Sequence, residues 1–133
     1  MSDGGSDSCD HQRMGRRVLI VDDHPSFRRF ATRLLDGAGF RVVGEAEDGK
    51  SALAAARRLR PELVLLDVLL PDMSGFEVAE ALAVDATRPL VVLVSSRSAS
   101  ELGAALEESR ADGFIAKEKL TAEALAAFMD GAS

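Results

Sequence analysis

LVLLDVLLPDMSGFEV, residues 63–78, begins with a run of aliphatic side chains that a single polar residue, Asp67, interrupts. A short, continuous aliphatic run is typical of a strand that is buried on both faces of a parallel sheet. A carboxylate inside such a run is costly, because taking a charge out of water is unfavourable unless a partner compensates for it. The stretch therefore predicts a buried strand whose end carries an acid with a specific partner.

The segments around this strand alternate between helix and strand patterns. Between residues 25 and 39 the apolar side chains recur at the spacing of one helix face, and Pro25 suits the first position of that helix. A last helix is expected to begin at Thr121, a residue type that caps helix N-termini. The expected strands cover 16–23, 41–46, 62–67, 89–96 and 113–117, and the remaining expected helices cover 51–60, 76–84 and 99–110.

Five strands and five helices in strict alternation predict an α/β fold. Continuous aliphatic strands joined by helices form a doubly wound parallel sheet with helices on both faces and right-handed crossovers. In such folds ligands bind beyond the C-terminal ends of the strands, where the strand order reverses. A functional site is therefore expected at that edge of the sheet.

Composition excludes several classes of function. The net charge is −6 and the pI is near 4.9, which argues against a domain that grips nucleic acid by neutralising phosphates. No apolar run approaches the roughly 20 residues that cross a bilayer, and no signal peptide is evident. The lone cysteine, Cys9, cannot form an internal disulfide. We expect a cytoplasmic protein that contacts neither nucleic acid nor membrane directly.

The chain of 133 residues suits one domain. Residues 1–14 are rich in Gly, Ser and Asp and show no periodicity, so they predict a disordered N-terminal tail. The folded domain is expected to cover 15–133.

The carboxyl ends of four predicted strands carry charged or hydroxyl groups. Asp22 and Asp23 follow the first strand, Asp67 ends the third, Ser95 ends the fourth and Lys117 ends the fifth. If these strands are neighbours, the side chains meet in one shallow pocket. Three carboxylates there would repel each other, and a divalent cation would remove that repulsion. Mg²⁺ favours one or two carboxylates together with waters and phosphate oxygens, which matches this set.

The same residues suit phosphoryl transfer. Lys117 offers a point charge for a phosphate oxygen, and the hydroxyl of Ser95 can donate a hydrogen bond to it. A carboxylate such as Asp67 can act as the nucleophile when a metal and a cation neutralise the transferred group. Ser96 is expected only to shape the pocket, and His24 is expected to be a loop residue outside the metal ligands.

Four motifs, LIVDDHP, LVLLDVLLPDMSG, VLVSS and GFIAK, stand in the order and spacing of one known family. From about Arg16 to Met129 the chain resembles the receiver (CheY-like) domain of bacterial two-component response regulators. The segment that contains Pro71 and Gly75 is the most specific piece, and DDHPSFRR is similar to the NarL/LuxR-like subgroup. The resemblance implies a flavodoxin-like strand order, 2-1-3-4-5.

By this resemblance Asp67 is the phosphoacceptor. Mg²⁺ would be held by Asp22, Asp23, Asp67 and the backbone carbonyl of Leu69. The protein would catalyse only its own phosphorylation and dephosphorylation, and would not otherwise be an enzyme.

The resemblance also implies a switch. Ser95 and Lys117 would contact the phosphoryl group, and Phe114 takes the place of the aromatic residue that turns inward on activation. Leu69 and Arg97 occupy the positions that tune the lifetime of the phosphoryl group.

The family's partners are a histidine kinase or a phosphotransfer protein as donor, and an effector domain or protein as output. The readout surface would comprise the fourth helix, the fifth strand and the fifth helix, residues 99–129, which can also form a homodimer. Too few residues follow the last helix for a linker and an effector. A stand-alone receiver and the N-terminal half of a DNA-binding transcriptional regulator therefore both remain open.

Three residues depart from the family pattern. Ser95 stands where Thr is commoner, and it keeps the hydroxyl. Phe114 lacks the hydroxyl that a Tyr would have there. Glu118 replaces the usual proline after Lys117, and a cis peptide there would cost roughly 3–4 kcal/mol against about 1 for a bond to proline. We therefore predict a trans peptide or a locally rearranged loop.

Two other classes of function share part of this pattern. A phosphatase of the haloacid-dehalogenase type also uses a strand-end Asp, but it needs a second Asp two residues later, where this chain has Leu69. A receiver-like docking module that works without phosphorylation is the other alternative, and the acids together with Lys117 argue against it.

Overall fold

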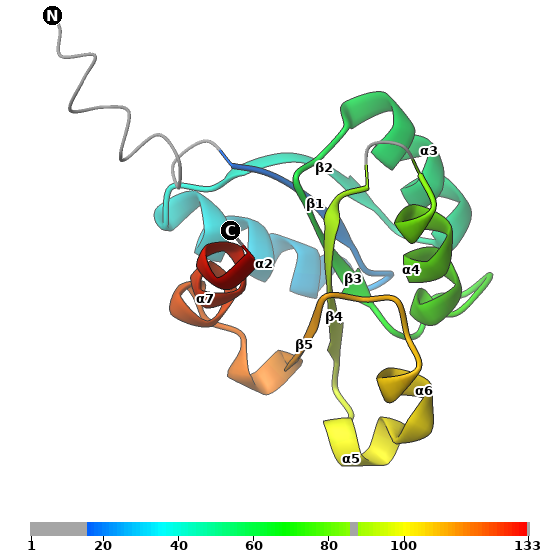
Figure 1. Cartoon of the computed structure of the whole chain (residues 1–133). Helices are drawn as coiled ribbons and strands as arrows, with labels where there is room; N and C mark the ends of the chain where they lie inside the picture. Colours follow the sequence, from blue (N-terminus) through cyan, green and yellow to red (C-terminus); the bar gives the residue numbers. More distant parts are fainter. Residues whose placement is uncertain (1–15, 86–87, 133) are drawn as a thin grey trace, which may run out of the picture.

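The computed structural model describes residues 16–85 and 88–132 (Figure 1). Its five strands are all parallel and lie in the order β2-β1-β3-β4-β5, which confirms the expected fold class and strand order. The strands are β1 (Arg17–Val21), β2 (Arg41–Ala46), β3 (Leu63–Asp67), β4 (Leu90–Ser95) and β5 (Gly113–Ala116). The stretch quoted above thus supplies the central strand, β3, which is buried along its whole length.

The helices follow the strands as the periodicity predicts. Pro25 is the first residue of its helix, and Thr121 caps the last one, since its Oγ1 accepts a hydrogen bond from the backbone N–H of Ala124 at 3.0 Å. The helices are α2 (Pro25–Gly37), α3 (Gly49–Leu59), α4 (Gly75–Ala83), α5 (Ala99–Leu102), α6 (Ala104–Glu107) and α7 (Ala122–Ala132).

The prediction of one continuous helix over 99–110 is wrong. The chain forms two short helices, α5 and α6, that are separated by Gly103. The backbone of Gly103 has φ 57° and ψ −133°, a conformation that residues with a Cβ avoid. An apolar pattern at helical spacing continues through this glycine, so periodicity alone does not reveal the break.

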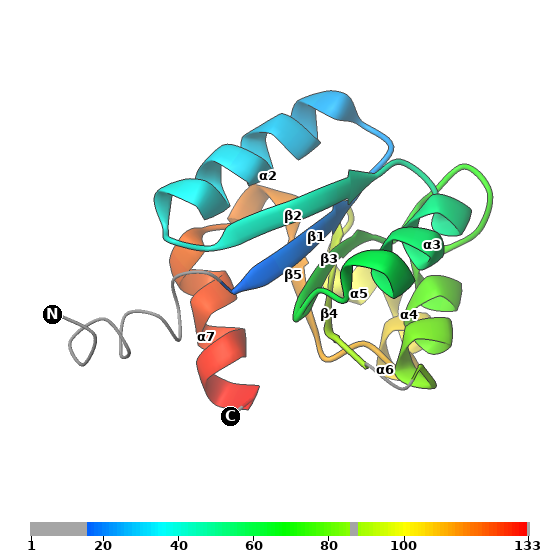
Figure 2. The ribbon, with the colours of Figure 1, turned by 90° about the horizontal axis from the view of Figure 1, so that it is seen from above.

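The sheet lies between two layers of helices, with α2 and α7 on one side and α3 and α4 on the other (Figure 2). Successive side chains of a strand point to opposite faces, so each layer packs on its own hydrophobic core. On one face, Val18 and Leu65 pack with side chains of α2 and α7, including Leu35 and Leu125. On the other face, alternate strand residues pack with side chains of α3 and α4 and with Leu102 and Leu106 of the divided helix. Helices therefore cover both faces, as predicted.

The peptide between Lys117 and Glu118 is trans, as predicted, and none of the described peptide bonds is cis. Lys117 opens a single 3-10 turn, η1 (Lys117–Lys119), that leads from β5 toward α7. The local rearrangement leaves the Lys117 side chain at the carboxyl edge of the sheet.

Two expectations concern other parts of the chain. The predicted N-terminal tail, residues 1–14, with Cys9, lies outside the described residues. Among the helices that the structure does describe, none has the length and apolar content to span a bilayer.

Candidate functional site

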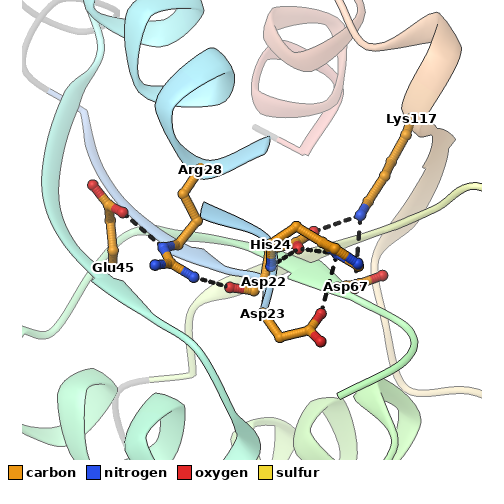
Figure 3. Close-up of polar contacts among 7 residues, drawn as sticks. All are labelled: Asp22, Asp23, His24, Arg28, Glu45, Asp67 and Lys117. Carbon is orange, nitrogen blue, oxygen red and sulfur yellow. Dashed lines mark hydrogen bonds and ion pairs between the residues drawn. The ribbon is translucent and has the colours of Figure 1, made fainter. Parts of the chain in front are cut away.

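The carboxyl ends of three strands bring four of the predicted residues together (Figure 3). In register, Val21 of β1 pairs with Leu66 of β3, and Asp67 pairs with Val94 of β4. The chain therefore leaves these strands at one edge, between β1 and β3, where the strand order reverses. One potential ligand atom from each of Asp22, Asp23, His24 and Asp67 lies within 4.8 Å of the others.

Asp22 is the most enclosed acid of the cluster, with no solvent-exposed surface. Its Oδ1 accepts a hydrogen bond from the backbone N–H of His24 at 2.8 Å. Its Oδ2 has no well-aligned hydrogen-bond donor and instead meets the ammonium group of Lys117 at 2.6 Å. A buried carboxylate oxygen that depends on a single flexible cation is a place where a second cation would be accommodated.

His24 lies closer to the acids than expected. Its Nδ1 is 2.9 Å from Oδ1 of Asp22 and 3.2 Å from Oδ1 of Asp23. Its side chain is nevertheless 64% exposed, so the ring lies on the solvent side of the buried Asp22 carboxylate. The position directly after two acids was the available signal, but it did not specify this contact.

Lys117 follows the C-terminal residue of β5, and its side chain extends into the cluster. Its Nζ lies 2.6 Å from Oδ2 of Asp22 and 3.7 Å from Oδ2 of Asp67, and its side chain is only 17% exposed. The ammonium group therefore sits between the two buried acids and is nearer to Asp22.

The pKa of Asp67 is raised to about 6, chiefly by burial of the carboxyl group and next by the negative charge of Asp22. The Lys117 ammonium and a hydrogen bond from the backbone N–H of Leu69 act in the opposite direction, while Asp23 adds a smaller upward effect. The crowding of acids that the sequence predicts is thus present, and one lysine does not neutralise it.

This pKa predicts how the stability of the metal-free protein depends on pH. Because folding raises the pKa of Asp67, the folded state binds more protons than the unfolded state between pH 4 and 6. The contribution of Asp67 to the free energy of unfolding is therefore fully present below about pH 4 and is lost as pH rises through about 6. Solvent at the open side of the pocket screens the charges and makes the effect smaller. We therefore expect the free energy of unfolding to fall by on the order of 1–2 kcal/mol over this pH range.

The measurement is denaturant unfolding of the wild type and Asp67→Asn in EDTA across pH 4–7. The variant lacks this titration, so it should become the more stable of the two as pH rises, and Mg²⁺ should reverse the trend for the wild type. If the difference in unfolding free energy between the wild type and Asp67→Asn did not change with pH, the prediction would be contradicted.

The loop after Asp67 is tied at both ends. The backbone N–H of Gly75 donates to the carbonyl of Val68 at 2.6 Å, and Leu69 forms an antiparallel bridge with Ser74. The Asp72 carboxylate accepts hydrogen bonds from the first two N–H groups of α3, at 2.7 and 3.0 Å. These bonds fix the loop that contains the Leu69 carbonyl, whereas the Leu69 side chain is 59% exposed.

The other predicted site residues lie outside the acid cluster. Ser95 is buried, and its hydroxyl oxygen accepts a hydrogen bond from the backbone N–H of Arg97 at 3.0 Å. Phe114 is half-buried and lines a cavity of about 490 Å³ together with Ser96 and residues of α5 and η1. The side chain of Arg97 is exposed.

Arg28 is a further residue of the site, and the sequence pattern did not predict its contacts. Its guanidinium donates to the backbone carbonyl of Asp22 at 2.6 Å and to the carboxylate of Glu45 at 2.9 Å, and so joins the ends of β1 and β2 beside the acids, on the side away from Lys117 (Figure 3). An arginine on the first turn of a helix that follows two acids was the only signal in the sequence.

The donor set fits a hard divalent cation. Three carboxylates converge with a buried oxygen that lacks an aligned donor, and oxygen ligands of this kind are the ones that Mg²⁺ prefers. The residues that the structure brings together can therefore hold a metal and, with Lys117, neutralise a phosphoryl group.

Comparisons with known proteins agree with this geometry. A family model described as the response regulator receiver domain matches residues 18–129. The DNA-binding response regulator MtrA of Mycolicibacterium smegmatis is 42% identical over 106 residues, which are 78% of this chain and 45% of that protein. The nitrate/nitrite response regulator protein NarP of Escherichia coli K12 is 39% identical over 103 residues, 77% of this chain and 48% of that protein.

Solved structures show the same similarity. The signal receiver domain of the putative response regulator NarL from Mycobacterium tuberculosis is 35% identical and superposes with a TM-score of 0.76. That match covers 90% of this chain and 97% of the other. By contrast, the chain spans about half the length of the curated relatives it matches. The family model covers residues 18–129, a range that contains all the acids and the lysine of the cluster, and the chain therefore belongs to the family of receiver domains of two-component response regulators.

Proposed function

We propose that Asp67 accepts a phosphoryl group in a Mg²⁺-dependent reaction and that this modification switches the domain. The observation that carries the proposal is the convergence of Asp22, Asp23 and Asp67 within 4.8 Å, with the Lys117 ammonium between two of them. An oxygen of Asp67 would attack the phosphorus atom of the donor, and the bond from phosphorus to the donor would break. The imidazole of a phosphohistidine donor takes its proton from solvent, whereas acetyl phosphate releases acetate, which needs none.

The metal would be held by Asp22, Asp23, Asp67 and the backbone carbonyl of Leu69. When bound, Mg²⁺ supplies neutralisation of the charge on the transferred group. The residues of the chain do the rest: Asp67 is the nucleophile, and the Lys117 ammonium moves from the carboxylates toward the phosphoryl oxygens.

The switch would start at Ser95. Its hydroxyl now accepts a hydrogen bond from Arg97, and it would have to turn to donate to a phosphoryl oxygen. This turn would draw the loop after β4 toward Asp67. Phe114, which lines the adjacent cavity, would then move inward, and Leu69 and Arg97 would tune the lifetime of the phosphoryl group.

A phosphorylation switch of this kind needs a phosphoryl donor and an output partner. The donor would be a histidine kinase or a phosphotransfer protein in the cytoplasm, and the protein would catalyse only its own phosphorylation and dephosphorylation. The output surface would be formed by α5, α6, β5 and α7, as a homodimer or toward an effector. Two curated relatives named as response regulators are about twice as long as the matched region, and MtrA is described as DNA-binding, which supports an effector in the whole protein.

The test is phosphorylation by acetyl phosphate, followed by intact-protein mass spectrometry. With Mg²⁺ the protein should gain the mass of one phosphoryl group, and with EDTA it should gain almost none, because the acids then repel the donor. Calorimetry should show Mg²⁺ binding before the donor is added. A protein that gains no phosphoryl group in Mg²⁺ would instead favour the docking module that works without phosphorylation.

A further inference from the structure

The aromatic ring of Phe27 contacts the cation of the site. Phe27 lies in the first turn of α2, and its ring centroid is 4.5 Å from Nζ of Lys117, which comes from the end of β5. An ammonium group over an aromatic face within about 6 Å is attracted by the ring quadrupole. The hydrophobic pattern of α2 accounts for an apolar residue at position 27, but it does not require an aromatic one.

The Lys117 ammonium needs such a contact. Its flexible stem of four methylene groups must hold the charge within reach of Asp67, yet the nearer anion is Asp22, at 2.6 Å against 3.7 Å. The Lys117 side chain is 17% exposed, so little water competes for the ammonium group. Cation–π attraction is strongest in this desolvated setting.

An aromatic face differs from a carboxylate as a partner. It attracts the cation without fixing one bond direction, so the ammonium group can move from Asp22 toward a phosphoryl oxygen and still contact the ring. We infer that Phe27 is a positioning residue that holds the Lys117 ammonium over the pocket during phosphoryl transfer. This inference rests on the proposed function of Asp67 and Lys117, and Phe27 itself touches neither the donor nor the reacting atoms.

The same helix provides a matched control. Phe30 lies one turn further along α2, is 48% exposed, and its ring centroid is 6.1 Å from that of Phe27. Phe30 shares the residue type and the helix with Phe27 but not the contact with Lys117. Changes at the two positions therefore separate the effect of the ring face from the effect of altering an aromatic residue.

The experiment incorporates phenylalanine analogues with increasing numbers of fluorine atoms at position 27, and in a parallel series at position 30. Fluorination weakens the ring quadrupole while it largely keeps the shape of the side chain. At Phe27 the rate of phosphorylation by acetyl phosphate in Mg²⁺ should fall stepwise, to about one fifth to one thirtieth at full fluorination. At Phe30 the rate should stay unchanged. Phe27→Tyr keeps the ring face and should be phosphorylated at the rate of the wild type. Phe27→Leu should be slowed about as much as the fully fluorinated protein.

A second readout does not depend on phosphorylation. The ε-methylene protons of Lys117 should be shifted upfield by the ring in the NMR spectrum, and Phe27→Leu should move them downfield while Phe30→Leu leaves them in place. Rates that stay flat across the Phe27 series, equal losses at Phe30, or unmoved Lys117 protons would overturn the inference. If the wild type took up no phosphoryl group, the proposed function would fail, and the Lys117 protons would still decide whether Phe27 holds the ammonium.

Discussion

Asp67→Asn should take up no phosphoryl group from acetyl phosphate in Mg²⁺, while the wild type is modified once. The carboxamide keeps the size of the side chain but replaces a nucleophilic oxygen with nitrogen and removes the negative charge. Asp67 is the end residue of β3 and is 4% exposed, so the strand fixes the position of its carboxylate at the edge of the sheet. The measurement is intact-protein mass over time, with the site located by fragmentation.

The matched control is Asp36→Asn, at an exposed acid near the end of α2. This variant should be phosphorylated at the rate of the wild type. Asp67→Asn should also be at least as stable as the wild type in EDTA at pH 7, because it removes one of the crowded charges. Loss of phosphorylation can then be attributed to chemistry and not to unfolding. Equal modification of Asp67→Asn and the wild type would place the acceptor elsewhere.

Gly75→Ala should give the second large effect, on stability and on phosphorylation together. A Cβ at position 75 would overlap the backbone carbonyl oxygen of Asp67 and lie 2.9 Å from the Cα of Val68. Both obstacles are backbone atoms, so the loop that follows Asp67 has to move. We expect a loss of about 3 kcal/mol in the free energy of unfolding. We also expect phosphorylation to slow by roughly a hundredfold, because a shift of about 1 Å misplaces the nucleophile.

Gly37→Ala is the control for this prediction. Gly37 is the last residue of α2, and a Cβ there would meet no other atom within 4 Å. Its stability should change by less than about 1 kcal/mol and its phosphorylation rate should not change. Urea unfolding and phosphorylation rates of both variants check the prediction. If Gly75→Ala were as stable and as active as Gly37→Ala, the close contact between Gly75 and the loop would not exist.

The strands and most helices could be predicted because their signals are local. The run at residues 63–67 is uniformly aliphatic up to Asp67, and the apolar spacing of α2 matches one helix face. The prediction of a continuous helix over 99–110 was wrong because the backbone breaks the helix at Gly103. Glycine is compatible with a helix and with the conformation that breaks one, so only the backbone angles decide between them.

The candidate site, too, could be predicted only in part from the sequence. The positions of Asp22, Asp23, Asp67 and Lys117 at strand ends were enough to predict that they meet, because parallel strands end at one edge of the sheet. The contacts of His24 and Arg28 were not predicted. Spacing along the chain tells which edge a residue occupies, but it does not tell which of its atoms meets which neighbour.

The sequence by itself determined the alternation of elements, the charges at the carboxyl edge and the family. The tertiary structure alone decided how the Lys117 charge is shared, at 2.6 Å from Asp22 and 3.7 Å from Asp67, and that it lies over Phe27. The physical reason is that hydrophobic periodicity acts between neighbours in the chain. The position of one ammonium group, in contrast, depends on the packing of β1, β3, β5 and α2, which are brought together only when the whole sheet forms.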